Sequence, residues 1–155
     1  MMKNKSRLLL LILMAFLGMG AIGGGGALIL APDGEMLQMP LSMLEHSPFN
    51  NFLIPGIILF TVLGISPFLL IFFLIKKPEF RIAEFLNIYK DMHWSWTFTI
   101  YLSFALIIWL QVEMLMLKDV HWLHAFYMFF AVLLLLVSLL PSIRNQYKIK
   151  DKQHD

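Results

Sequence analysis

Hydrophobic and polar positions divide this chain into four long apolar runs separated by short polar connections. The runs cover residues 8–30, 52–75, 97–117 and 122–140. A helix rises about 1.5 Å per residue, so roughly 20 residues cross the roughly 30 Å hydrocarbon core of a bilayer. The pattern therefore predicts an all-α membrane protein in which residues 1–155 form one domain, a bundle of four transmembrane helices.

Composition supports this prediction and excludes several other classes of protein. Hydrophobic residues make up 59% of the chain and charged residues only 14%, well below the share in soluble domains. The absence of cysteine excludes disulfides, thiolate metal ligands and palmitoylation. The sequence also has no phosphate-binding glycine loop, HExxH metal motif or nucleic-acid-binding module. We therefore expect contact with the lipid bilayer, and neither a cofactor, a metal nor nucleic acid.

The distribution of basic residues predicts the orientation of the chain. Lysine and arginine concentrate on the cytoplasmic side of membrane proteins. Eleven of the twelve basic residues lie before the first run, between the second and third, or after the fourth: Lys3, Lys5, Arg7, Lys76, Lys77, Arg81, Lys90, Arg144, Lys148, Lys150 and Lys152. Both termini are thus predicted to be cytoplasmic, in the inner membrane of a bacterium. The first run exceeds the length of a signal-peptide core, so we expect a retained helix.

The first run is rich in glycine, with residues Gly18, Gly20, Gly23, Gly24, Gly25 and Gly26. Glycine lets a second helix backbone approach closely, and small residues commonly mark helix contacts in lipid. These positions predict close helix packing or a local bend. The packing partner is either another helix of this chain or a second membrane protein, including another copy of the chain.

Proline and aromatic residues predict further local features. Pro67, in Gly64-Ile65-Ser66-Pro67, predicts a kink in the second span because proline cannot donate a backbone hydrogen bond. Pro40 is expected to begin a short helical turn on the outer face.

The inner connection, residues 76–94, is amphipathic and predicts an interfacial helix or an extension of span three, with Ile82, Phe85, Leu86 and Tyr89 on one face. Trp94 and Trp96 are expected in an inner aromatic belt, Trp122 in an outer one. The basic tail from Arg144 is expected to be solvated.

Glu113 is the most informative polar residue because it lies inside the third apolar run. An ionisable group within a span normally faces protein or a water-filled cavity. The short connection after residue 117 predicts an antiparallel hairpin of spans three and four, which brings His124 to the depth of Glu113. His121 shares a helix face with His124, and His46 from the first connection is a candidate to join them.

Two interpretations of Glu113, His121, His124 and His46 remain open. One is a structural hydrogen bond between helices, which polar side chains in membranes often form. The other is a site that relays protons or holds a polar ligand. A metal site is disfavoured because sequence spacing fixes no third ligand, and no catalytic constellation is apparent.

The segment Ser47-Pro48-Phe49-Asn50-Asn51-Phe52-Leu53-Ile54-Pro55-Gly56, with Pro32-Asp33-Gly34 before it, resembles an element of small bacterial four-helix inner-membrane proteins of unassigned function. This resemblance implies the four-span plan and no activity. The DoxX-like and EXPERA proteins are similar in architecture only. EXPERA proteins carry ionisable groups in several spans, including the second, whereas this second span has none. Isomerase chemistry is therefore not carried over.

Two functions compete at this point. The first is a non-enzymatic accessory component that binds a partner protein, favoured by the glycine-rich first span. The second is a membrane protein that binds a small molecule or lipid, as a transporter or enzyme, in an outer-leaflet pocket. That pocket would lie between span two and the span three–four hairpin, with Glu113 as its polar anchor.

Overall fold

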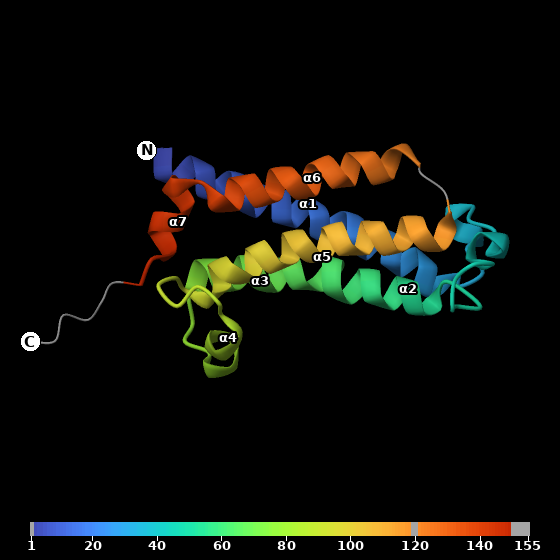
Figure 1. Cartoon of the computed structure of the whole chain (residues 1–155), viewed down its shortest axis with the longest axis horizontal. Helices are drawn as coiled ribbons and strands as arrows, with labels where there is room; N and C mark the ends of the chain where they lie inside the picture. Colours follow the sequence, from blue (N-terminus) through green and yellow to red (C-terminus); the bar gives the residue numbers. More distant parts are fainter. Residues whose placement is uncertain (1, 119–120, 150–155) are drawn as a thin grey trace, which may run out of the picture.

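The computed structural model describes residues 2–118 and 121–149, and four of its helical segments are long and apolar enough to cross a membrane. These are residues 5–30 of α1 (Met2–Leu30), residues 53–76, α5 (Trp94–Leu117) and α6 (Trp122–Leu139). The four segments pack side by side in one bundle (Figure 1). Four helices long and apolar enough to be the predicted spans are thus present, and the third begins at Trp94 rather than at residue 97.

The second span is not a uniform helix. It consists of α2 (Leu53–Ile58), the π-helix η3 (Leu59–Ile65) and α3 (Ser66–Lys76). Pro67 lacks an N–H, and in a regular α-helix its ring would collide with the carbonyl four residues earlier. The backbone widens just before it, where the Ser66 N–H bonds to the Thr61 carbonyl five residues back. The Ser66 Oγ donates to the same carbonyl at 3.1 Å. The proline from which we predicted a kink thus lies just after a π-helix. The kink itself stays a prediction.

The connection between α1 and α2 folds into two short 3₁₀ turns, η1 (Glu35–Leu37) and η2 (Leu41–Leu44). The second follows Pro40, as predicted. Leu44 and Phe52 are buried with Leu28 of α1, so this connection is anchored to the bundle by a small apolar cluster. We call this end of the molecule, which also contains His121 at the start of α6, the loop end.

The connection before α5 contains a short separate helix, α4 (Arg81–Leu86), rather than an extension of α5. Ile82, Phe85 and Leu86 are exposed, as an amphipathic helix requires, and Phe85 is 82% exposed. Tyr89 lies beyond the helix, which corrects the prediction that it shares this face. The helix ends because Asn87 adopts extended backbone and its buried side chain bonds to the Met92 carbonyl and the Thr97 hydroxyl.

Trp94 and Trp96 do not lie in an aromatic belt but in the core, where they are 2% and 1% exposed. Their indole N–H groups donate to the Pro78 carbonyl at 2.9 Å and the Ser138 carbonyl at 2.8 Å. Because these polar atoms find partners inside the protein, the rings need not reach the membrane surface. Trp122 is 67% exposed, as expected of a belt residue.

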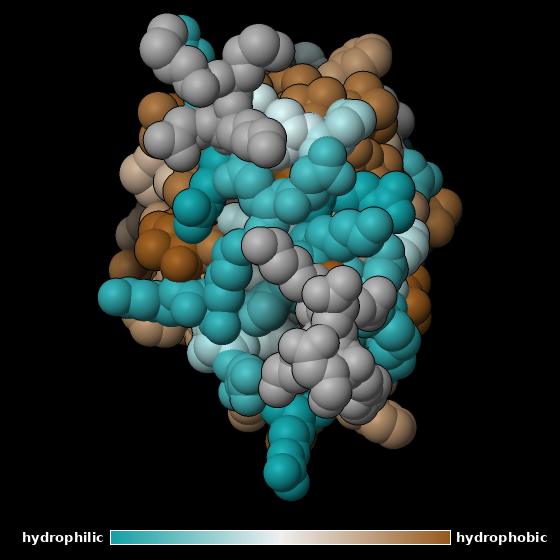
Figure 2. All heavy atoms as spheres, turned by 90° about the vertical axis from the view of Figure 1, so that its left-hand side faces the viewer, coloured by the Kyte–Doolittle hydropathy of each residue, from teal (hydrophilic) through white to brown (hydrophobic). Residues whose placement is uncertain are grey.

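Part of the basic tail is helical. Pro141 ends the fourth span and begins α7 (Pro141–Tyr147). Arg144 and Lys148 are exposed, as expected of a solvated tail, whereas Tyr147 is buried against the bundle. The remaining tail residues, 150–155, lie outside the described part of the chain. Helix α7 lies beside the start of α1 (Figure 1), and hydrogen bonds from Lys77 to the Gln146 carbonyl and from Tyr147 to the Leu74 carbonyl join it to the end of α3. Figure 2 shows hydrophilic residues gathered over this end, which we call the basic end.

Candidate functional site

A cavity of about 520 Å³ opens within the bundle toward the loop end. Its wall comes from α1, η3, α5, α6 and the connection that contains η1 and η2. Most of the wall is apolar. The polar side chains of the wall belong to Gln38, Trp109, Glu113, His121, His124 and Tyr127.

Small residues of α1 form one side of this cavity. Gly20, Ala21 and Gly24 all line it. A Cβ atom added at Gly24 would lie 3.6 Å from a methyl group of Leu59, an ordinary contact distance. A Cβ atom at Gly20 would lie 2.8 Å from the Tyr127 hydroxyl. The missing side chain at Gly24 therefore contributes directly to the free volume, whereas the one at Gly20 makes room for Tyr127.

The other glycines of α1 have different surroundings. A Cβ at Gly18 would come within 3.0 Å of the Gly64 carbonyl, and one at Gly25 within 2.7 Å of the Phe60 backbone nitrogen. Both positions therefore pack tightly on the second span of the same chain. A Cβ added at Gly26 would lie 3.8 Å from the Phe60 ring, whereas nothing lies within 4 Å of one added at Gly23. The glycine-rich stretch thus divides into a packed face, a cavity face and an open position.

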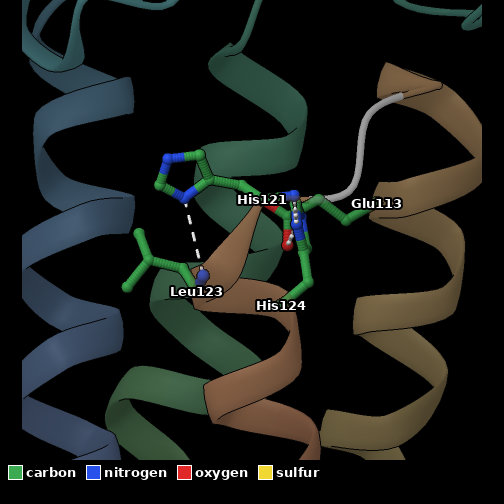
Figure 3. Close-up of polar contacts among 4 residues, drawn as sticks. All are labelled: Glu113, His121, Leu123 and His124. Carbon is green, nitrogen blue, oxygen red and sulfur yellow. Dashed lines mark hydrogen bonds and ion pairs between the residues drawn. The ribbon is translucent and has the colours of Figure 1, made fainter.

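Glu113 and His124 face each other across the α5–α6 hairpin at the polar end of the cavity (Figure 3). The Glu113 Oε2 and His124 Nε2 atoms are 3.8 Å apart, and the two side chains are 29% and 9% exposed. The facing arrangement that the sequence predicted is therefore present. The separation exceeds that of a short hydrogen bond, so the carboxylate retains capacity to accept from another group.

His121 and His124 also cap the start of α6. The His124 Nδ1 atom accepts a hydrogen bond from the His121 backbone N–H at 3.0 Å. The His121 Nδ1 atom accepts from the Leu123 backbone N–H at 3.5 Å (Figure 3). A nitrogen that accepts a hydrogen bond carries no proton, so these contacts assign a neutral imidazole with its proton on Nε2 to both residues. In His124, this is the nitrogen that faces Glu113.

The structure does not bring every predicted residue to this site. His46 lies exposed in the turn after η2 and does not line the cavity. Gln38, Trp109 and Tyr127 line it, although the sequence did not single them out. Helical spacing could have indicated two of them, because Trp109 precedes Glu113 by four residues and Tyr127 follows His124 by three. Gln38 comes from an irregular connection whose path no periodicity predicts.

Among the described residues, no group of three or more histidine, aspartate or glutamate side chains is placed to hold a metal ion. The fold and this site define a class: an integral membrane protein with four apolar helices and an internal, partly polar cavity. No family model, curated protein or solved structure matches the chain. The resemblance drawn from the sequence consequently remains one of architecture, and the chain is assigned to no family.

Proposed function

We propose that this protein binds a small, largely apolar molecule in the cavity at the loop end. The cavity carries this proposal: its volume, about 520 Å³, falls within the range of small-molecule sites. Such sites are typically apolar with a few converging polar groups that orient the ligand. Glu113, His124 and Tyr127 supply such groups here.

The glycine-rich helix supports the same conclusion. Glycine in a helix costs roughly 1 kcal/mol relative to alanine, so a glycine that faces a cavity weakens the helix without gaining a contact. Gly24 holds such a position, whereas Gly20 makes room for the Tyr127 hydroxyl. Binding of a ligand in the space beside Gly24 would offset the cost of that glycine.

The glycine-rich first span no longer favours an accessory component that binds a partner protein. Gly18 and Gly25 pack on the second span of their own chain, so close association with a second protein is not needed to explain them. A membrane-protein partner or a homo-oligomer stays compatible with a binding function. We propose no enzymatic reaction for this cavity.

The positive-inside rule supports a location for the site. If the basic end faces the cytoplasm, both termini are cytoplasmic and the cavity lies in the outer half of a bacterial inner membrane. This orientation is supported by four basic residues at the basic end, Lys76, Lys77, Arg81 and Arg144. Ligand would then enter from the outer leaflet or the outer aqueous phase.

Two adjacent glycines provide a matched test. The protein and its Gly24→Leu and Gly23→Leu variants would be extracted in mild detergent and weighed by native mass spectrometry. Leucine at position 24 projects into the cavity, whereas leucine at position 23 meets open space. We expect the wild type and Gly23→Leu to retain a discrete small molecule that Gly24→Leu loses. Equal retention by both variants would contradict the cavity as its binding site.

A further inference from the structure

The charge of the cavity wall indicates what kind of molecule it accepts. Among the described residues that line it, Glu113 is the one carboxylate, and the wall contains no lysine or arginine. Lys118 follows the end of α5 but is exposed and outside the wall. An ionised Glu113 therefore faces the cavity without a fixed positive charge to balance it.

The two imidazoles do not supply that positive charge in this arrangement. Each uses Nδ1 to accept a backbone N–H at the start of α6. Protonation would turn Nδ1 into a donor that faces another donor, at the helix end where the backbone dipole is already positive. With both Nδ1 atoms engaged as acceptors, an ionised Glu113 is the one charge at the polar end of the cavity among the described residues.

Two aromatic side chains line the cavity one helical turn deeper than the Glu113–His124 pair. Trp109 lies one turn before Glu113 on α5, and Tyr127 lies one turn after His124 on α6, and both line the cavity. The faces of tryptophan and tyrosine rings attract ammonium and guanidinium groups, especially where water is excluded.

The remaining wall suits an apolar body. It is formed by leucines and methionines, among them Leu17, Leu28, Leu59, Leu63, Met39 and Met43. Apolar groups gain from burial in such a wall in proportion to the area removed from water. A ligand that satisfies both parts must carry a positive head and an apolar tail.

We propose that the ligand of this cavity is an amphiphilic cation whose ammonium or guanidinium head lies against Glu113, between Trp109 and Tyr127. This inference rests on the proposed binding function and specifies its ligand class. An ionised Glu113 would repel an anionic ligand, and a wholly apolar ligand would leave that carboxylate without a counterion.

Two probes of matched shape separate the head group from the tail. Octyltrimethylammonium carries a quaternary nitrogen, and 2,2-dimethyldecane has a carbon atom in its place. Binding would be measured by native mass spectrometry of the full chain in nanodiscs, competing each probe against the other. Wild type, Glu113→Gln, Gly24→Leu and Gly23→Leu would be compared. Glutamine keeps the size of the side chain and removes its charge.

We expect wild type and Gly23→Leu to prefer the cation by at least about tenfold, the scale on which losing one member of a desolvated charge pair acts. Glu113→Gln should lose this preference and retain the neutral probe, and Gly24→Leu should bind neither. Equal binding of both probes by wild type would overturn the cationic class and leave the binding function standing. If neither probe binds the wild type more tightly than it binds Gly24→Leu, the binding function is overturned as well.

Discussion

The two ends of the bundle use their polar residues in opposite ways. At the basic end, buried polar groups form hydrogen bonds across helices: the Trp96 indole donates to the Ser138 carbonyl, and the Tyr147 hydroxyl to the Leu74 carbonyl. Two buried atoms at this end, Arg7 Nε and His93 Nε2, have no hydrogen-bond partner among the described residues. At the loop end, Glu113 and His124 are 3.8 Å apart beside a cavity of about 520 Å³. Hydrogen bonds between helices stabilise a fold, whereas polar groups next to a cavity can also bind a ligand.

The basic end also holds charges that serve the fold. The Arg7 guanidinium donates to the Leu74 carbonyl at 2.9 Å, and the Lys77 ammonium donates to the Gln146 carbonyl and lies 4.5 Å from the centre of the Tyr147 ring. Burial, with a smaller contribution from the neighbouring Arg7, lowers the pKa of Lys77. Burial likewise raises the pKa of Tyr147. These side chains join α7 to the ends of α1 and α3.

Replacing a tryptophan should lower the free energy of unfolding far more at the basic end than at the loop end, and this is the largest difference that we expect. Trp96→Ala removes a fully buried ring and leaves the Ser138 carbonyl without its donor. We expect the free energy of unfolding to fall by about 3–5 kcal/mol. Trp122→Ala, at an exposed position near the loop end, should change it far less. Reversible unfolding in mixed micelles measures both, and similar losses would contradict the division into a structural and a binding end.

Asn87 tests whether the buried network of the basic end is required. Its side chain accepts from the Thr97 hydroxyl at 2.6 Å and donates to the Met92 carbonyl at 2.7 Å. Asn87→Ala leaves both groups unpaired, and we expect a loss of about 2 kcal/mol. Adding Thr97→Val to this variant should cost less than Thr97→Val costs in the wild type, because the shared bond is already lost. Strictly additive losses in the same unfolding assay would argue against that bond.

Neighbouring glycines sharpen the comparison within the loop end. Gly25→Ala brings a Cβ atom to 2.7 Å from the Phe60 backbone nitrogen, so the helices must separate. We expect destabilisation by about 1–3 kcal/mol. Gly24→Ala faces the cavity and should be neutral or stabilising by up to about 1 kcal/mol, because alanine favours helix. Thermal unfolding of the two variants side by side measures this contrast. Equal Tm losses would contradict the assignment of separate faces.

The smallest effects should come from the polar pair. His124→Ala removes the acceptor for the His121 N–H and should cost about 1 kcal/mol, as the loss of a helix cap does. Glu113→Gln should change stability by less than about 0.5 kcal/mol, because the pair is long and Glu113 is partly exposed. If the two side chains interact, the double variant will lose less than the sum of the single losses. A Glu113→Gln loss larger than that of His124→Ala would assign the pair a mainly structural role.

Much of the site was predictable from sequence because the third and fourth spans, α5 and α6, are joined by a short connection. That connection fixes an antiparallel hairpin, and counting residues from it brings Glu113 and His124 to one depth. The same counting fails for His46 and Gln38, which lie in the irregular connection before α2. The burial of Trp94 and Trp96 was also missed, because their preference for an interface is overridden when interior carbonyls accept their N–H groups.

The sequence by itself determined the four spans, the hairpin and the concentration of basic residues at one end. These features depend on hydrophobicity, length and charge, which add up along the chain whatever its neighbours do. Only the tertiary structure decided which glycines face Phe60 and which face the cavity, and which atoms of His121 and His124 cap α6. Those outcomes depend on how each helix is rotated against its neighbours, a property that arises when side chains from distant segments pack together.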